Sequence, residues 1–437
     1  MLFFNKINNY LIKSLVVIAF IQVLSDKNFY KLRLAIYTYG LRGGGTERAT
    51  ALLLKYLSNY NDFYIYVFSQ KHRQYDEFEI PYRIKRVYIE EKYSTIQLKK
   101  QLKIKKIDIL IYQFPHGDEI KMLNTLKNIK IIIYSHFCFL TWIYFYDIHY
   151  FNELYNSYKE SKYIISLVPF ENDYVFKKWG INSILMDNLV TYEYDDAIPS
   201  DLSSKIVLMI GRASDRFKRF ELGIQAMKYI SSEVKDCEMQ IISEMKRINK
   251  LEQLISDLEL TEKVKFLGYI SNLTNYFHNA SLHIFPTVSE AFPMVLCETK
   301  VFGIPNILTG VDFAAMSQNG TIIIYDDNPE TIAKESIKIL NNFTYRKKLG
   351  EKGRESMKKY KNEKTIEKWV KLIKAVYKGE KYYNDLKIDN RTISTKKNKE
   401  ITERQVKLIN MREPLLINLT IENLLNFSCI EKIMASL

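Results

Sequence analysis

The fold is decided by the stretch Ser289-Glu290-Ala291-Phe292-Pro293-Met294-Val295-Leu296-Cys297-Glu298. It follows the apolar run 282–285, which is typical of a buried strand. Pro293 can begin a helix as its first residue, because the N–H that proline lacks would have no partner there. The sequence therefore predicts a strand, a loop that carries Glu290, and a helix with Glu298 about five residues into it.

Hydroxyl and phosphate groups suit the polar atoms of this stretch. The free N–H groups at the start of the helix, at Met294 and Val295, would face hydroxyls or phosphate oxygens. A carboxylate accepts hydrogen bonds from two vicinal hydroxyls. Two carboxylates at the spacing of Glu290 and Glu298 could therefore hold a sugar ring and a ribose at once.

Outward from this stretch, short apolar runs alternate with amphipathic segments in both directions. In the second half the expected strands are 206–210, 239–242, 264–267, 282–285, 306–309 and 322–324, and helical patterns from 329 to 376 close this half. In the first half they are 32–39, 64–69, 84–88, 108–112, 131–135 and 163–167. Such alternation predicts an α/β fold with two doubly wound parallel sheets.

The alternation is interrupted at 188–204 by an acidic stretch that contains proline and serine, which indicates a domain boundary. The expected organisation is an N-terminal extension (1–30), a first domain (31–190), a second domain (191–380) and a C-terminal tail of unassigned role (381–437). The apolar run 11–24 is shorter than the ~20 residues of a membrane span, so we expect the extension to lie on the domain or on a membrane surface, with a signal peptide as the alternative.

Glycine is concentrated at one turn of a glycine-poor chain. Of 15 glycines, Gly40, Gly43, Gly44 and Gly45 lie between the first expected strand and the first helix. A glycine turn that opens a helix lets the backbone approach an anion closely. The alternative is a tight turn with no ligand.

Two cations follow the first strand of the second half. Arg212 and Lys218 lie where ligands of such sheets bind, beyond the carboxyl ends of the strands, and they suit a diphosphate. An arginine and a lysine in an exposed loop are also often simply solvated.

The composition limits the function without deciding it. The chain of 437 residues carries 64 basic and 50 acidic side chains, a formal charge of +14, which favours a polyanionic partner such as a lipid headgroup, a nucleotide or a nucleic acid. Its four cysteines are far apart and form no CxxC pair, so a reducing cytosol fits best. The basic helix 98–106 shows none of the signatures of a nucleic-acid-binding fold, and we expect no nucleic-acid partner.

Three motifs in order resemble family 4 of the retaining glycosyltransferases. They are Gly44-Gly45-Thr46-Glu47-Arg48, then Gly211-Arg212 with Lys218, then 289–293 through Glu298 followed by Gly303-Ile304-Pro305. Asn188-Leu189-Val190 and Asn319-Gly320 add to the likeness, which covers residues 32–378.

The resemblance implies a GT-B fold, two Rossmann-like domains that face a cleft. The first domain would bind the acceptor and the second the nucleotide sugar. It implies that Arg212 and Lys218 bind the donor diphosphate and that Glu298 binds the ribose. Glu290 and the backbone of Phe292, Pro293, Met294 and Val295 would hold the transferred sugar, while Gly44 and Gly45 would approach the donor phosphate or the acceptor. His136 matches a histidine that lines the cleft in many members, and a structural role is the alternative.

This chain departs from the family pattern at four places. The departures bear on the identity of the donor sugar more than on the transferase activity. Ala291 stands for a usual glycine, Arg219 for a common glycine or asparagine, and Leu189 for a usual proline. The loop after Gly310 lacks the family's glycine pair.

The resulting prediction is a metal-independent, retaining hexosyltransferase without a cofactor. It would transfer a sugar from a nucleoside diphosphate to a surface glycan or lipid-linked acceptor, as in polysaccharide, capsule or lipopolysaccharide synthesis. No Asp-x-Asp occurs, which argues against the metal-dependent GT-A alternative. The expected location is the cytoplasm, with the inner face of the plasma membrane and its anionic surface as a further expectation. The alternatives are a GT-B sugar-nucleotide epimerase and a basic nucleic-acid-binding protein.

Overall fold

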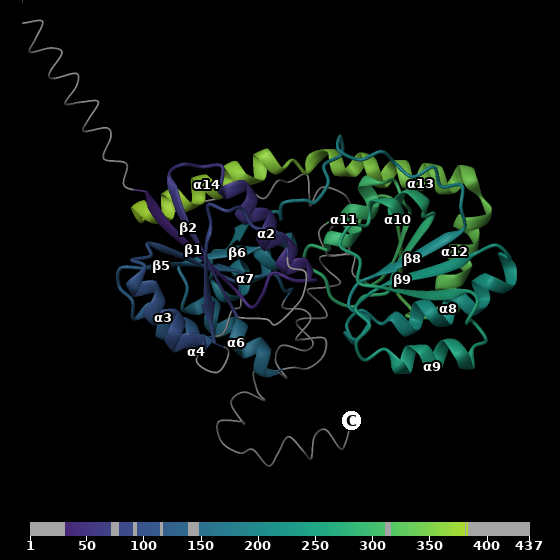
Figure 1. Cartoon of the computed structure of the whole chain (residues 1–437), viewed down its shortest axis with the longest axis horizontal. Coiled ribbons are helices and arrows are strands. Elements are labelled where there is room, and N and C mark those ends of the chain that lie inside the picture. Colours follow the sequence, from purple (N-terminus) through teal and green to yellow (C-terminus); the bar gives the residue numbers. More distant parts are fainter. Residues whose placement is uncertain are drawn as a thin grey trace, which may run out of the picture.

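Two parallel sheets, each covered by helices, make up the computed structural model of the chain (Figure 1). The structure describes residues 31–70, 78–90, 94–113, 117–138, 148–310, 316–380 and 382. The expected extension 1–30 and nearly all of the tail 381–437 lie outside the described residues.

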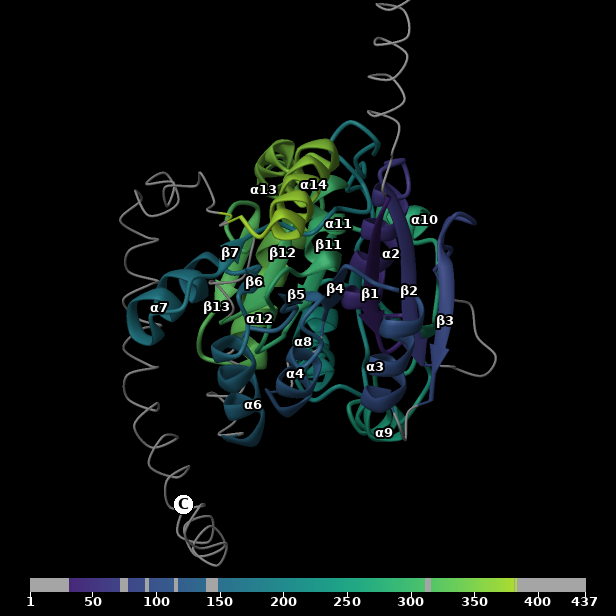
Figure 2. The same cartoon turned by 90° about the vertical axis from the view of Figure 1, so that its left-hand side faces the viewer.

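The first sheet has the strand order β3-β2-β1-β4-β5-β6-β7 within the described residues, and all of its pairs are parallel. Its strands are β1 (Leu32–Thr38), β2 (Phe63–Gln70), β3 (Lys85–Ile89), β4 (Ile109–Tyr112), β5 (Lys130–Tyr134), β6 (Tyr163–Ser166) and β7 (Ile184–Leu185). Figure 2 looks toward this sheet, with β3 and β7 at opposite edges. The helices between the strands are α2 (Gly45–Leu57), α3 (Ser94–Ile104), α4 (Gly117–Asn124), α6 (Ile148–Lys159) and α7 (Pro169–Trp179).

The second sheet repeats this arrangement with the order β10-β9-β8-β11-β12-β13. Its strands are β8 (Ile206–Ile210), β9 (Glu238–Ile242), β10 (Val264–Gly268), β11 (Leu282–Phe285), β12 (Asn306–Thr309) and β13 (Thr321–Ile324). The helices are α8 (Phe220–Glu233), α9 (Asn249–Asp257), α10 (Thr274–Asn279), α11 (Met294–Val301), α12 (Pro329–Asn341), α13 (Phe343–Glu355), the short η2 (Ser356–Lys359) and α14 (Asn362–Lys378).

The strand pattern of the sequence is confirmed. Every expected strand is present within one residue at either end. The central strands β4 and β11 are buried along their whole length, as parallel strands covered on both faces must be, and this explains why they read as unbroken apolar runs. The two-residue strand β7 was missed, because two residues carry no periodicity.

The last helix crosses back to the first sheet. Figure 1 shows α13 and α14 along one edge of the molecule, and α14 packs against α2 and β4. Trp369 of α14 is fully buried and meets the ring of Tyr134 edge-on at 5.0 Å between centroids. The segment expected to close the second domain therefore also covers the first, because an amphipathic pattern predicts a buried face but not its partner.

Both sheets reverse their strand order next to a central strand, between β1 and β4 and between β8 and β11. At such a reversal the loops that leave the carboxyl ends of the strands diverge and leave a crevice for a ligand.

None of the helices in the described residues is long and apolar enough to cross a membrane.

Candidate functional site

A cavity of about 210 Å³ lies between the two sheets, lined by residues that follow the carboxyl ends of their strands. Ten of the eleven site residues predicted from the sequence line it: Gly44, Gly45, His136, Arg212, Lys218, Glu290, Phe292, Pro293, Met294 and Val295. The remaining one, Glu298, is not among the lining residues. The fold therefore brings together groups that are distant in the chain, from Gly44 to Val295.

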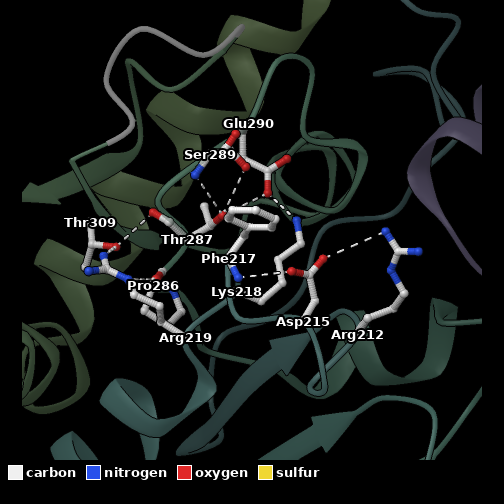
Figure 3. Close-up of polar contacts among 10 residues, drawn as sticks. All are labelled: Arg212, Asp215, Phe217, Lys218, Arg219, Pro286, Thr287, Ser289, Glu290 and Thr309. Carbon is white, nitrogen blue, oxygen red and sulfur yellow. Dashed lines mark hydrogen bonds and ion pairs between the residues drawn. The ribbon is translucent and has the colours of Figure 1, made fainter. Parts of the chain in front are cut away.

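Lys218 and Glu290 form an ion pair at the wall of the cavity (Figure 3). The lysine lies in the loop after β8 and the glutamate in the loop after β11, so adjacent strands position the pair. Thr287 donates a second hydrogen bond to the same Glu290 Oε1 at 3.1 Å. Both side chains are mostly buried, with 19% and 11% of their surface exposed.

Helix α11 points its N-terminal end at the same wall. It begins at Met294, one residue later than the sequence predicted, and Pro293 precedes it with an extended backbone. The Pro293 carbonyl accepts the first helical hydrogen bond from Cys297 N at 3.1 Å. The N–H groups of the first turn have no acceptor within a helix and carry its positive dipole end, which suits an anion or a hydroxyl.

The glycine turn reaches this helix from the first domain. Gly43 has a left-handed backbone (φ 71°), and Gly44 is the residue before α2. A Cβ added at Gly44 would lie 1.9 Å from Glu47 Oε2, so a larger side chain would displace that carboxylate. A Cβ at Gly45 would lie 3.6 Å from Met294 Cγ of α11. The turn thus lines the cavity from the first domain and lies next to the start of α11.

Arg212 is the most exposed of the predicted cationic groups. Its side chain is 57% exposed, and Nη2 lies 3.8 Å from Asp215 Oδ2 in the same loop. Such an exposed pair contributes little to stability. The guanidinium is therefore available to a ligand in the cavity that it lines.

His136 follows β5 and lines the cavity from the first domain. Its Nε2 is buried and has no hydrogen-bond partner, and its ring lies 4.1 Å from that of Tyr134. Burial lowers the pKa of His136 from 6.5 to about 3, so the ring is neutral at neutral pH. A neutral imidazole can donate or accept one hydrogen bond but brings no charge.

Glu298 lies behind the cavity wall, where residues from elsewhere in the chain hold its carboxylate. Its side chain has no exposed surface, and Oε1 accepts hydrogen bonds from Arg48 of α2 and from Thr191 Oγ1, the latter at 2.7 Å. Its Oε2 has no partner. The carboxylate raises the pKa of the Arg48 guanidinium. The ribose contact stays a prediction, and any such contact has to share this carboxylate with Arg48.

Sequence reasoning missed four residues at or beside the site: Arg42, Arg48, Glu244 and Tyr269. Arg48 was visible only as the end of the Gly-Gly-Thr-Glu-Arg run, and its partner is 250 positions away. Arg42 Nη2 lies 3.8 Å from Glu244 Oε1 of the second domain, and its guanidinium carbon is 6.0 Å from the centre of the Tyr269 ring. No spacing rule connects these residues, because they meet only where the two domains face each other.

Comparison with known sequences points to one family of enzymes. Residues 191–356 match the family described as "Glycosyl transferases group 1". The chain is 22% identical over 302 residues to an uncharacterized glycosyltransferase of Haemophilus influenzae, covering 68% of this chain and 83% of that protein. It is 25% identical over 192 residues to a Campylobacter jejuni α-1,4-N-acetyl-D-galactosaminyltransferase named for an acceptor on PP-undecaprenol, covering 42% of this chain and 52% of that one.

Solved structures show the same fold. Sucrose-phosphate synthase from Thermosynechococcus elongatus superposes with a TM-score of 0.68 at 15% identity, covering 80% of this chain and all of that one. Anabaena HepE in complex with UDP-glucose gives a TM-score of 0.63 at 11% identity, covering 79% and 100%. The chain thus has the GT-B fold, and part of its sequence is similar to group 1 glycosyltransferases.

Proposed function

We propose that this chain, with its GT-B fold and its match to group 1 glycosyltransferases, transfers a sugar from a nucleoside diphosphate to a surface glycan or lipid-linked acceptor. The observation that carries the proposal is the convergence of Lys218, Glu290 and the N-terminal end of α11 on one cavity between the domains. A diphosphate needs cations and N–H donors, and a sugar needs a carboxylate that accepts from hydroxyls. This wall offers all three.

In this proposal the diphosphate lies against Lys218, Arg212 and the first turn of α11. Leaving-group charge develops there as the glycosidic bond breaks, and fixed donors stabilise it without reorganising. We assign Glu290 to the hydroxyls of the transferred sugar and the neutral His136 to a further hydroxyl from the acceptor side. Glucose, galactose, mannose and their N-acetylated forms all offer vicinal hydroxyls to a carboxylate, so Glu290 does not distinguish these sugars. UDP, GDP and ADP all contain a ribose, so a contact with the ribose does not distinguish the bases.

The reaction we propose retains the anomeric configuration. The resemblance to family 4 implies attack from the face that the phosphate leaves, with an oxocarbenium-like sugar shielded by the departing diphosphate. Because Lys218 and Arg212 supply positive charge, transfer should not need a divalent metal. Activity that disappears in EDTA and returns only with Mg²⁺ or Mn²⁺ would contradict this part of the proposal.

We place the acceptor and a membrane surface on the side of the first domain. Helix α3 exposes Lys100 and Lys103 together with Ile96, 66% exposed, and Ile104, 56% exposed. Cations attract anionic headgroups, and apolar side chains between them can enter the interface. The Campylobacter relative is named for an undecaprenol-linked acceptor, which supports a lipid-linked one here. The aromatic stretch 142–146, which the sequence also suggests for this surface, lies outside the described residues.

A ligand screen tests the proposed function directly. Thermal unfolding would be followed with UDP, GDP, ADP and their sugars, and each stabilising sugar nucleotide would then be tested for hydrolysis and transfer. Stabilisation by one nucleotide identifies the base, because a ligand that binds only the folded state raises the unfolding temperature. A folded preparation that no nucleotide stabilises, but that binds nucleic acid at ~0.15 M salt, would favour the alternative hypothesis of a nucleic-acid-binding protein.

Sedimentation with vesicles tests the membrane surface. Binding to vesicles with anionic lipids should exceed binding to neutral vesicles, and Lys100→Glu with Lys103→Glu should remove the difference. Equal sedimentation with both kinds of vesicle would indicate an acceptor taken from solution.

A further inference from the structure

Arg219 directly follows Lys218, at a position where the resembled family commonly has glycine or asparagine. Its backbone is left-handed (φ 45°), a conformation that suits glycine and strains a residue with a side chain. The residue is nevertheless an arginine, and only 15% of its side-chain surface is exposed. We therefore expect the contacts of the Arg219 side chain to offset the strain of its backbone.

Its guanidinium joins residues at the carboxyl ends of three strands. Figure 3 shows its contacts with Pro286 and Thr309. Nε donates to the carbonyl of Pro286, just after β11, at 2.9 Å. Nη2 donates to Thr309 Oγ1, at the end of β12, at 2.7 Å. Asp327, beyond β13, receives Nη2 on one oxygen and pairs with Nη1 on the other, both at 2.8 Å. This two-pronged geometry is specific to arginine.

These contacts lead to Glu290 through the loop after β11. Thr309 Oγ1, which accepts from Arg219, donates to the Thr287 carbonyl at 3.0 Å. Thr287 Oγ1 donates to Glu290 Oε1 at 3.1 Å, and Lys218 binds the same oxygen. The loop that carries Glu290 is thus held by Arg219 at its start and by Lys218 at its end.

We propose that Arg219, with Asp327, is a positioning residue that fixes the loop 286–290 so that Glu290 and Lys218 face the sugar and diphosphate together. The inference rests on the proposed function. Neither Arg219 nor Asp327 lines the cavity, so both act through other residues.

The test compares Arg219→Gly with Arg216→Ala. Glycine adopts the left-handed backbone without strain, so the first variant removes the guanidinium without adding strain. Arg216 is an exposed arginine of the same loop that does not line the cavity, and its removal changes the net charge equally. Asp327→Asn and the double variant Arg219→Gly with Asp327→Asn complete the set.

Two readouts decide the outcome. In Arg219→Gly, kcat per folded molecule should fall about tenfold to a hundredfold while the donor KM stays within about threefold, because misplacing a catalytic group by about 1 Å costs this much. The double variant should be no worse than Arg219→Gly alone. Hydrogen exchange at residues 287–291 should accelerate in Arg219→Gly and stay as in the wild type in Arg216→Ala.

Three results would overturn the proposal: unchanged kcat, a raised donor KM with kcat retained, which would mean direct contact with the donor, or unchanged exchange in the loop. A wild type that turns over no sugar nucleotide would reject the proposed function instead. The exchange measurement would then still decide whether Arg219 orders the loop.

Discussion

Arg48 of α2 donates a hydrogen bond to the buried carboxylate of Glu298 in α11, and this ion pair joins the two domains directly beside the cavity. Arg48 lies in the first turn of α2, directly after the glycine turn, and Glu298 ends the stretch that carries Glu290. The ion pair is therefore a direct link between the first and the second domain.

Replacing Arg48 by Met should lower the free energy of unfolding by about 3 kcal/mol, because it leaves a buried carboxylate without its charge partner. Thr191 would remain as a donor to Glu298. Urea denaturation measures the loss, and adding Glu298→Gln to Arg48→Met should recover part of it. Strictly additive losses in the double variant would mean that the two side chains are not energetically coupled.

Glu290→Gln and Lys218→Met should each lower sugar transfer at least about a hundredfold while the fold remains intact, since each removes charge where the transition state develops it. Steady-state kinetics with the nucleotide sugar found in the ligand screen measures the effect. Glu221→Gln, an exposed position at the start of α8, is the matched control. Near wild-type turnover in both site variants would show that the site lies elsewhere.

Arg212→Ala should weaken binding of the free nucleoside diphosphate by about 1.5 kcal/mol, the lower end of the range for a lost charge-assisted hydrogen bond. The low value is expected because the side chain is largely exposed and solvent screens it. Isothermal titration calorimetry measures this loss, with Arg216→Ala as the control in the same loop. Equal affinities of Arg212→Ala and the wild type would remove Arg212 from the diphosphate site.

His136 should make the free energy of unfolding depend on pH under acidic conditions. Its pKa is about 3 in the folded protein and 6.5 when unfolded, so between these values only the unfolded chain takes up the proton. The free energy of unfolding should therefore fall as pH decreases from about 7 to 5, by at most about 2 kcal/mol from this residue. His136→Gln should show a correspondingly smaller decrease in urea denaturation. Parallel pH profiles for the two proteins would mean that His136 is solvated.

Lys300 should make the free energy of unfolding depend on pH under alkaline conditions. This buried lysine of α11 donates to the carbonyls of Met316 and Gln318, and burial lowers its pKa from 10.5 to about 7. Between these values the unfolded chain binds a proton that the folded chain releases, so stability should rise with pH across this range, by at most about 3 kcal/mol from pH 7 to 9.5. Lys300→Met should be less stable overall and lack this rise in urea denaturation. A Lys300→Met profile with the wild-type slope would contradict the assignment.

The strands could be predicted because burial on both faces of a parallel sheet imposes a local pattern. Runs such as 109–112 and 282–285 are apolar throughout, and their limits follow from the polar residues that flank them. The places of Lys218 and Glu290 at the cavity could be predicted for a related reason: each lies just after a strand, where ligands of such folds commonly bind.

What the tertiary structure decided is which of these groups meet. The amphipathic pattern of α14 shows an apolar face but not that it covers the first sheet, and nothing local connects Arg48 with Glu298 or Arg219 with Asp327. Hydrophobic periodicity is a property of neighbouring residues, whereas an ion pair between distant segments depends on how two finished domains and their loops are placed. The sequence alone therefore determined the layers of this protein and ten of the residues that line its cavity, and the packing of those layers determined how the charges around the cavity are paired.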